Sequence, residues 1–338
     1  MKQFTLAPYF HPTTVCVVDD NESFAESLSF ELPRGWACRT FVDPLAARDY
    51  LNEEPKLPPL VDRCFTLNST SSSEAVVHLD LSLIEQEINH VERFRRISVL
   101  VVDYAMPSLD GLELCAQVRD PYLRKVMLTG VADEKLAVEA FNAGLIHRFV
   151  PKQSPDAIST TIAYVRELQQ AYFNQYSARL QNTLSISPPP FLVDAAIADW
   201  VTAFMQRERF VEYYLVDEPP GFMLLRSDGS IQRLIIIDAK GLAEQLAYAQ
   251  DCGAPAEICA AVASQRAACL LTGDDPRDYY GDAEYPWAEK LIPVEAVQGD
   301  IQWFLGVSQN PPTDIDFDPR QASYDAYLAS VSAAAAGD

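Results

Sequence analysis

The chain has 338 residues, of which 49% are apolar and 22% charged, and its net charge is −22. This length suits two domains, and the apolar fraction is sufficient for a buried core. No apolar run is long enough to span a bilayer, and residues 1–12 lack the pattern of a secretory signal. The seven scattered cysteines do not form a disulfide framework, so we expect a reducing, cytoplasmic location and no membrane segment.

The negative charge is concentrated in the second half of the chain. Residues 190–338 carry a net charge of −15, against −7 for residues 1–189. Nucleic-acid binding depends on Lys and Arg side chains that neutralise phosphates, and the second half contains no run of basic residues. We therefore expect this half to bind protein partners, and neither nucleic acid nor membranes.

The first half alternates strands and helices. Strands are predicted at residues 14–18, 36–41, 97–102, 125–128 and 146–150, and helices at 21–32, 43–51, 112–118, 134–142 and 155–184. Five strands that alternate with helices predict an α/β fold, a doubly wound parallel sheet with helices on both faces.

Residues 53–96 interrupt this alternation as an insertion that is far longer than an ordinary connection. Within it, residues 79–94 have apolar side chains at helical spacing and predict an added amphipathic helix. This helix either covers part of the sheet or mediates dimerisation and the choice of partner, and the sequence leaves both open.

Three consecutive prolines within residues 185–190 mark the clearest domain boundary. Beyond it, a helix at 193–209, strands at 212–216, 221–226 and 231–238 and further helices predict a separate α+β domain. We therefore expect an N-terminal segment (1–12), a five-stranded domain (13–154), an extended helix and linker (155–184), an α+β domain (190–330) and a disordered tail (331–338).

Polar side chains follow four of the five predicted parallel strands. They are Asp19 and Asp20, Asp103, Thr129 and Lys152. In an open parallel sheet such groups gather beyond the carboxyl ends of the strands. Three carboxylates brought together repel one another, and oxygen ligands of this kind suit Mg²⁺. A hydroxyl and an ammonium beside them can bind the oxygens of a phosphoryl group.

These residues resemble the receiver domain of two-component response regulators. The motifs that carry the resemblance are residues 17–21 (VVDDN), 101–107 (VVDYAMP) with Asp110-Gly111, 127–130 (MLTG) and 149–152 (FVPK). Together they cover about residues 13–170. The resemblance implies a flavodoxin-like fold and a place in a phosphorelay, with a sensor histidine kinase or phosphotransfer protein as partner.

The resemblance also implies roles for single residues. Asp103 takes a phosphoryl group from a phosphohistidine of the partner. Asp20 binds Mg²⁺ directly, Asp19 binds it mainly through water, and the backbone carbonyl of Ala105 is a further ligand.

On the opposite side of the phosphoryl group, Lys152 and the hydroxyl of Thr129 hold its oxygens. Phe149 occupies the position of the switch aromatic, which packs inward when Thr129 moves toward the phosphate. From the residues alone, Phe149 also fits an ordinary core aromatic.

One departure from the family pattern concerns the order Pro151-Lys152-Gln153. The family usually has Lys-Pro with a cis peptide bond. A cis bond before a residue other than proline costs ~2.5–4 kcal/mol. We therefore expect a trans bond between Lys152 and Gln153, and a shifted lysine.

The second half contains none of the motifs of cyclic-dinucleotide turnover, a nucleotide-binding loop or a zinc protease. We therefore expect a response regulator whose non-classical acidic output acts through protein–protein contacts, homodimerisation or both, with dimer contacts from the helix at 155–184 and the inserted helix. The only expected catalysis is the receiver's own phosphorylation and dephosphorylation.

An alternative function rests on three residues of the second half. Asp228 lies in an Asp-Gly turn, and the strand that follows ends in Asp238-Ala-Lys240. This pattern resembles the PD-(D/E)xK nuclease core, in which carboxylates hold Mg²⁺ and the lysine positions water. It predicts a nuclease-like or nucleic-acid-binding output, whereas a hairpin turn and a capped strand end explain the same residues without any activity.

Overall fold

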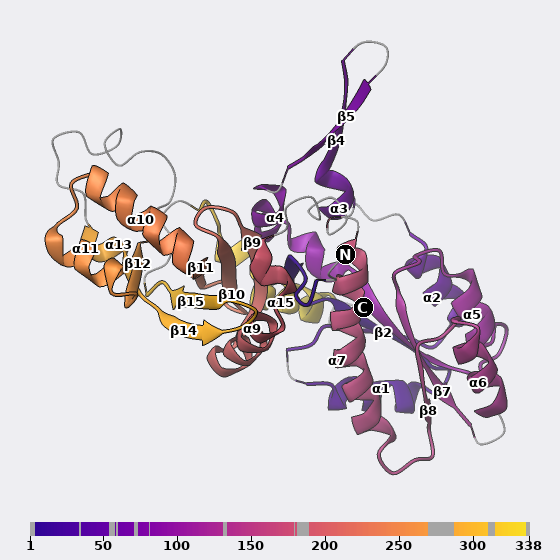
Figure 1. Ribbon diagram of the computed structural model, residues 1–338. Coiled ribbons are helices and arrows are strands. Elements are labelled where there is room, and N and C mark those ends of the chain that lie inside the picture. The colour runs from indigo at the N-terminus through magenta and orange to yellow at the C-terminus, as the bar shows by residue number, and fades with distance from the viewer. Residues whose placement is uncertain are drawn as a thin grey trace. The chain divides into compact units, whose positions relative to one another are not determined.

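The structure is a computed structural model that describes residues 4–33, 35–53, 58, 60–70, 74–80, 82–130, 134–178, 180, 189–269, 287–309 and 315–335. It divides into two compact units (Figure 1). Unit 1 comprises Met1–Phe10, Leu60–His90 and Arg179–Ser323, and unit 2 comprises His11–Pro59, Val91–Ala178 and Tyr324–Asp338. The chain therefore passes between the units five times, which differs from the linear series of domains that the sequence suggested.

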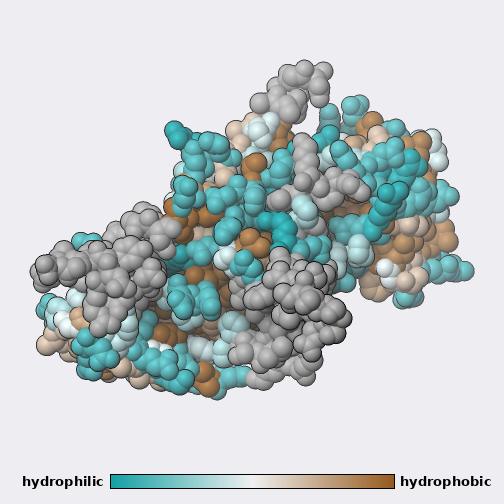
Figure 2. All heavy atoms as spheres, turned by 90° about the horizontal axis from the view of Figure 1, so that it is seen from above, coloured by the Kyte–Doolittle hydropathy of each residue, from teal (hydrophilic) through white to brown (hydrophobic). Residues whose placement is uncertain are grey.

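The visible surface is rich in polar side chains, as the many charged residues of the sequence lead one to expect. Figure 2 shows a face that is largely hydrophilic, with apolar side chains in smaller groups between polar ones. The chain has 48 acidic residues against 26 basic ones. Within the described part of the chain, no helix has both the length and the apolar character needed to cross a bilayer.

Unit 2 is built on a five-stranded parallel sheet. Its strands, in spatial order, are β3 (Cys38–Phe41), β2 (Thr14–Val18), β6 (Ile97–Asp103), β7 (Arg124–Thr129) and β8 (Arg148–Pro151). The central strands are apolar along nearly their whole length because both of their faces are buried. This is the doubly wound, flavodoxin-like sheet that the sequence predicted.

Helices cover both faces of this sheet. On one face, α1 (Glu22–Glu31) and α7 (Ala157–Tyr176) pack on residues such as Val17 and Val101. On the other face, residues such as Val18 and Val102 meet three helices, α2 (Pro44–Leu51), α5 (Gly111–Gln117) and α6 (Glu134–Asn142). Successive residues of one strand point to opposite faces, which explains the alternation between the two cores.

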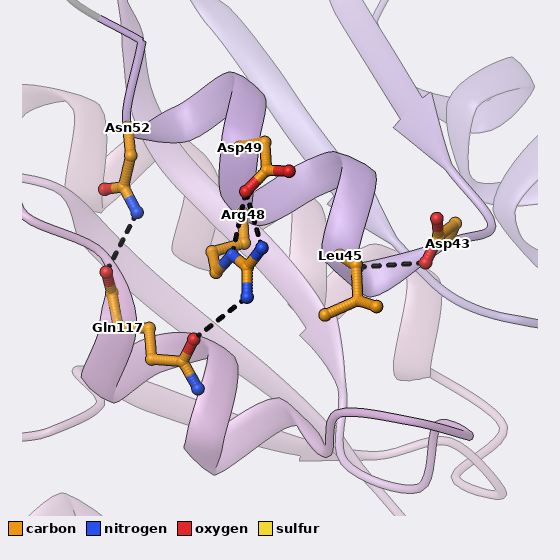
Figure 3. A network of polar contacts seen from close by, with 6 residues as sticks. All are labelled: Asp43, Leu45, Arg48, Asp49, Asn52 and Gln117. Atoms are coloured by element: carbon orange, nitrogen blue, oxygen red, sulfur yellow. Dashed lines mark hydrogen bonds and ion pairs between the residues drawn. The ribbon is translucent and has the colours of Figure 1, made fainter.

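Local hydrogen bonds fix the ends of α2 and join it to α5 (Figure 3). Asp43 accepts a 3.0 Å bond from the backbone N–H of Leu45, as expected of an N-cap. At the other end, Asn52 donates to the backbone carbonyl of Gln117 at 3.0 Å, and Arg48 donates to the Gln117 side chain at 3.4 Å. The last turn of α5 is therefore held by α2.

The helix predicted at 155–184 is shorter than expected. It is α7, and it ends at Tyr176. Val165, Leu168 and Tyr172 on its apolar side are buried inside unit 2, so this side is not free for a dimer contact. Residues 179 and 181–188 of the predicted helix and linker lie outside the described residues.

The last described residues return to unit 2 as α15 (Tyr324–Ala335), where the sequence suggested a disordered tail from 331. The Tyr324 hydroxyl accepts a 2.9 Å bond from the backbone N–H of Ala37, and the Tyr327 and Thr14 hydroxyls are 2.8 Å apart. Both tyrosine rings also contact Phe94, which is fully buried. The helix thus closes the edge where β2, β3 and β6 begin, and residues 336–338 lie outside the described residues.

Unit 1 contains an antiparallel sheet of six strands. In spatial order they are β1 (Tyr9–Phe10), β9 (Phe210–Val216), β10 (Gly221–Arg226), β11 (Ile231–Asp238), β15 (Gln302–Val307) and β14 (Glu295–Gln298). The three strands predicted between 212 and 238 are β9 to β11. The N-terminal segment is not separate, because Tyr9 pairs with Tyr214 at the edge of this sheet.

Helices lie on both faces of this sheet as well. One face is covered in part by α10 (Ala239–Asp251) and α11 (Ala256–Ala263), with α13 (Trp287–Lys290) and the pair β12 (Ala267–Cys269) and β13 (Leu291–Pro293). The opposite face carries α9 (Ala195–Glu208) and the 3-10 helix η4 (Pro190–Val193), whose Phe191 meets the rings of Phe222 and Trp303. A short helix, α14 (Pro319–Ala322), precedes α15.

The insertion does not form the single helix predicted at 79–94. It forms α3 (Leu60–Arg63), a hairpin of β4 (Phe65–Thr70) and β5 (Glu74–Leu79), α4 (Ser82–Gln86) and the 3-10 helices η1 (Glu87–Asn89) and η2 (Val91–Arg95). Residue 79 ends a strand, and the extended backbone of His90 separates η1 from η2, so the helical pattern is broken at both places.

Candidate functional site

Three carboxylates meet at the carboxyl edge of the sheet of unit 2. Asp19 follows β2 directly, and Asp103 is the last residue of β6, the neighbouring parallel strand. Ligand oxygens of Asp19, Asp20 and Asp103 lie within 4.8 Å of one another. Asp19 and Asp103 are buried and Asp20 is exposed, so the group opens to solvent on one side.

Lys152 lies against this group. Its Nζ is 2.7 Å from Asp19 Oδ2 and 2.9 Å from Asp103 Oδ2. Its backbone N–H donates to the carbonyl of Thr129 at 2.9 Å, which fixes it at the end of β8. Glu218–Pro219 is the one cis peptide within the described ranges, so the Lys152–Gln153 bond is trans. The reversed order of proline and lysine therefore does not remove the ammonium from the site.

Thr129 ends β7, and its side chain is fully buried. Its Oγ1 has no hydrogen-bond partner among the residues that the structure describes. A buried hydroxyl without a partner carries a free-energy cost, so such groups are uncommon in folded proteins. An anion bound beside Asp103 could accept this hydrogen bond, which makes Thr129 a candidate ligand.

The electrostatics of Asp103 reflect its surroundings. Burial raises the pKa of its carboxyl above the ordinary value, and the charges of Asp19 and Asp20 raise it further. The hydrogen bond and charge of Lys152 act in the opposite direction. The ionised carboxyl is therefore disfavoured mainly by its burial, and a bound cation would favour it.

Two further residues shape the site. The backbone N–H of Asn21 donates to Asp19 Oδ1 at 3.0 Å, while the Asn21 side chain caps α1. Gly111 begins α5, and a Cβ at this position would lie 2.2 Å from the backbone oxygen of Asp103. Only glycine allows the helix to approach the strand so closely. Asn21 and Gly111 both stood in the motifs; the bonds of Asn21 are local in sequence, whereas the role of Gly111 depends on the contact of α5 with β6.

Phe24 was missed by the sequence analysis as part of the site. Its ring centroid lies 4.7 Å from Nζ of Lys152, a cation–π distance. The sequence showed only an apolar position in the first turns of α1. No local signal pairs it with a lysine that follows a distant strand.

The donor set fits a magnesium ion. All the candidate ligands are oxygens, three of them belong to carboxylates, and the one exposed carboxylate leaves room for water. The backbone of Ala105, the further ligand that the family resemblance implies, lies in the loop that follows β6. Asp19, Asp20 and Asp103 are therefore the residues that would hold the ion.

Phe149 lies in β8 and is half-buried, packed against the core that contains Met127. Its ring meets that of Phe141 of α6 edge to face, with the centroids 6.4 Å apart. This position is compatible with an ordinary core aromatic and with a switch.

The candidate residues of the alternative function are not brought together. Asp228 stands in the turn before β11, where it accepts a 2.8 Å bond from the backbone N–H of Ser230, and Asp238 ends the same strand as the N-cap of α10. An eight-residue strand separates them by roughly 25 Å. Lys240 is 82% exposed and pairs with Glu244 one turn along the helix. Each residue has a local structural role.

Comparisons with known proteins agree with the geometry of unit 2. A family model for the response regulator receiver domain matches residues 71–163, which include Asp103, Thr129 and Lys152. The structure of the response regulator LqsR of Legionella pneumophila is similar to this chain at 30% identity, with a TM-score of 0.78. The similarity covers 97% of each chain and thus extends over both units.

Isolated receiver domains match less of the chain. A response regulator receiver protein of Pseudomonas putida covers 46% of this chain and 97% of its own, at 20% identity and a TM-score of 0.31. The receiver domain of Francisella response regulator 1452 covers 47% and 98%, at 17% identity and a TM-score of 0.32. Among curated proteins, none matches the chain. On the family model and the full-length similarity to LqsR, the chain belongs to the response regulators of two-component systems.

Proposed function

We propose that Asp103 is the phosphoacceptor of this response regulator and that a histidine kinase or phosphotransfer protein supplies the phosphoryl group. A carboxylate oxygen of Asp103 forms the new P–O bond as the P–N bond of the donor phosphohistidine breaks. The product is an acyl phosphate on Asp103. The observation that carries this proposal is the ion pair of Lys152 with Asp103, together with the buried Thr129 hydroxyl, which has no hydrogen-bond partner within the described part of the chain.

The surrounding residues position and neutralise the group in transit. Lys152 exchanges part of its contact with Asp19 and Asp103 for the phosphoryl oxygens, and Thr129 donates its hydroxyl to another oxygen. Asp19, Asp20 and Asp103 would hold a magnesium ion, which would supply positive charge to offset the charge of the phosphoryl group. Chemistry of this kind needs accurate placement more than an added acid or base.

Labelling of Asp103 tests this proposal directly. Wild-type protein, incubated with acetyl phosphate and magnesium, should gain one phosphoryl group, located at Asp103 by mass spectrometry. Asp103→Asn should gain none, because the amide is a far weaker nucleophile. Asp110→Asn is the matched control, since Asp110 caps α5 close by and should not affect the chemistry. Undiminished label in Asp103→Asn would refute the assignment.

We also propose that phosphorylation promotes homodimerisation, through α6. Val138 and Phe141 of this helix are 43% and 42% exposed and, three residues apart, lie on the same side of it. Phe141 contacts Phe149, so a movement of Phe149 toward Thr129 would reach this surface. Light scattering should give a larger mass when magnesium and beryllofluoride are added. An unchanged mass would remove dimerisation from the proposal.

For the output, we propose binding to a downstream protein without catalysis. Within the described residues, Asp19, Asp20 and Asp103 are the one cluster suited to a metal, and it lies in unit 2. The separation of Asp228 from Asp238 argues against a nuclease-like site in unit 1. The seven cysteines are all free thiols, which supports a cytoplasmic setting.

A further inference from the structure

One face of the sheet of unit 1 is covered in two parts, one that is apolar and one that contains charged side chains. Ile235 and Ile237 of β11 lie beneath α10 and α11 in an apolar core. Arg233 is on the same strand and, by the period of two, on the same face. The face therefore continues past the apolar core into a part that carries a buried charge.

The register of the strands defines this second part. Tyr214 of β9 pairs with Met223 of β10, and Met223 pairs with Arg233 of β11. Glu212 lies two residues before Tyr214 on the same face, and its carboxylate accepts a 2.6 Å bond from the Tyr214 hydroxyl. We call these four residues (Glu212, Tyr214, Met223 and Arg233) the polar strip. All four are buried.

The cover over the polar strip comes from the insertion. Helix α4 packs on β9, and Glu85 of α4 lies 2.6 Å from Nη2 of Arg233. Ile84 and Ile88 on either side of Glu85 are fully buried. The insertion thus offers a carboxylate to Arg233, with two buried apolar side chains, four residues apart, on either side of it.

The apolar cover (α10 and α11) and the charged cover (α4) should differ in how long each stays in contact with the sheet. Permanent interfaces are mainly apolar, whereas interfaces that form and separate keep polar and charged groups that tolerate water. Burying Arg233 and Glu212 under a cover that never opens would carry a desolvation cost that the apolar half avoids. If the polar strip is exposed to water part of the time, charged residues such as Arg233 and Glu212 are suited to it.

We propose that α4 is a releasable cover of the polar strip, and that the exposed strip binds an amphipathic helix of the downstream partner. That helix would carry two apolar residues four positions apart and a carboxylate for Arg233, as α4 and η1 do together. The inference rests on the proposed phosphorylation of Asp103, because both ends of the insertion continue into unit 2 and η2 leads directly into β6, the strand of Asp103.

Hydrogen exchange on the full chain, read by mass spectrometry, tests the release. Magnesium and beryllofluoride should make the amides of α4, η1 and β9 exchange at least about tenfold faster, while those of α10 and α11 keep their rates. Glu85→Gln should produce the same change without beryllofluoride, because it removes the charge that faces Arg233. Glu244→Gln, which removes the exposed Lys240–Glu244 pair on α10, should leave α4 unchanged.

A labelled peptide of residues 82–92 probes the binding face. It should bind to the Glu85→Gln chain and to the beryllofluoride-treated wild type, and binding should be lost when its own position 85 is glutamine. If the peptide with glutamine at position 85 binds as well as the original peptide, the proposed role of Arg233 is refuted. Exchange of α4 that stays as slow as that of α10 in every state would show a permanent cover and overturn the inference.

Acetyl-phosphate labelling separates this inference from the proposed function. If Asp103 is labelled and α4 does not open, only the releasable cover is refuted. If Asp103 takes no label while Glu85→Gln still opens α4 and binds the peptide, the cover is supported and the control by phosphorylation is refuted.

Discussion

Nζ of Lys152 lies 2.9 Å from a carboxylate oxygen of Asp103, although its backbone follows a strand that is not adjacent to that of Asp103. The same ammonium is 2.7 Å from Asp19. This ammonium offsets the charge of both buried carboxylates. Removal of this ammonium should therefore lower the stability of the protein most when no magnesium is present.

Lys152→Gln should lower the free energy of unfolding by about 2 kcal/mol in EDTA, the usual size of a hydrogen bond to a charged group. Saturating magnesium should recover much of this loss, since the ion replaces the missing charge. Urea denaturation in both buffers measures the difference. Lys240→Gln, whose ammonium is exposed, should cost less than about 0.5 kcal/mol in either buffer. An equal loss for Lys152→Gln with and without magnesium would contradict the shared role.

Thr129→Val should not destabilise the unphosphorylated protein, because the Thr129 hydroxyl has no hydrogen bond to lose among the residues that the structure describes. A gain of up to about 1 kcal/mol is expected from removal of the buried polar group. The rise in melting temperature caused by beryllofluoride should be smaller than in wild type. Thr161→Val is the control, since the buried Thr161 hydroxyl donates to Ala157 at 2.7 Å and its loss should destabilise. A destabilised Thr129→Val protein would show that the hydroxyl already has a partner.

Asp194 in unit 1 gives a prediction about pH. Burial alone would raise its pKa, but hydrogen bonds from the Trp303 indole and from the backbone of Asp300 and Ala196 hold the pKa below its ordinary value. A folded-state pKa that is depressed contributes stability above the unfolded pKa, which is lost as the pH falls. Asp194→Asn should therefore cost about 1–3 kcal/mol at neutral pH.

The same difference should shrink below about pH 4, where Asp194 of the unfolded chain begins to take up a proton while the folded protein still holds it ionised. Urea denaturation at several pH values measures it. Asp199→Asn on the exposed side of the same helix should change stability by no more than about 0.5 kcal/mol at any pH. If the loss of stability caused by Asp194→Asn stays constant down to pH 3, the charge of Asp194 is not what stabilises the protein.

The sheet of unit 2 and most of its site could be predicted because their signals are local. A parallel strand that is buried on both faces is a continuous apolar run, as in β6, and the polar residue after it marks the functional edge. Asp43 and Asp110 are helix N-caps, and each accepts a bond from a backbone N–H no more than three residues further along the chain. The fold class and the residues that gather beside Asp103 follow from such patterns.

The division into units could not be predicted because it depends on distant pairings. A two-residue strand such as β1 has no recognisable pattern, and only its pairing with β9 assigns it to unit 1. The carboxylate of Glu85 carries no sign that it faces Arg233. Conversely, Asp228 and Asp238 imitate a catalytic pattern because hairpin turns and helix N-caps both favour aspartate.

The position of α15 has a consequence for biosynthesis. Tyr324 and Tyr327 complete the edge of unit 2 where β2 and β3 begin, yet they are translated after the whole of unit 1. A chain emerging from the ribosome therefore carries the five strands of unit 2 long before the residues that cover the edge where β2 and β3 begin. The sheet of unit 2 should therefore reach its full stability only after the whole of unit 1 has been translated.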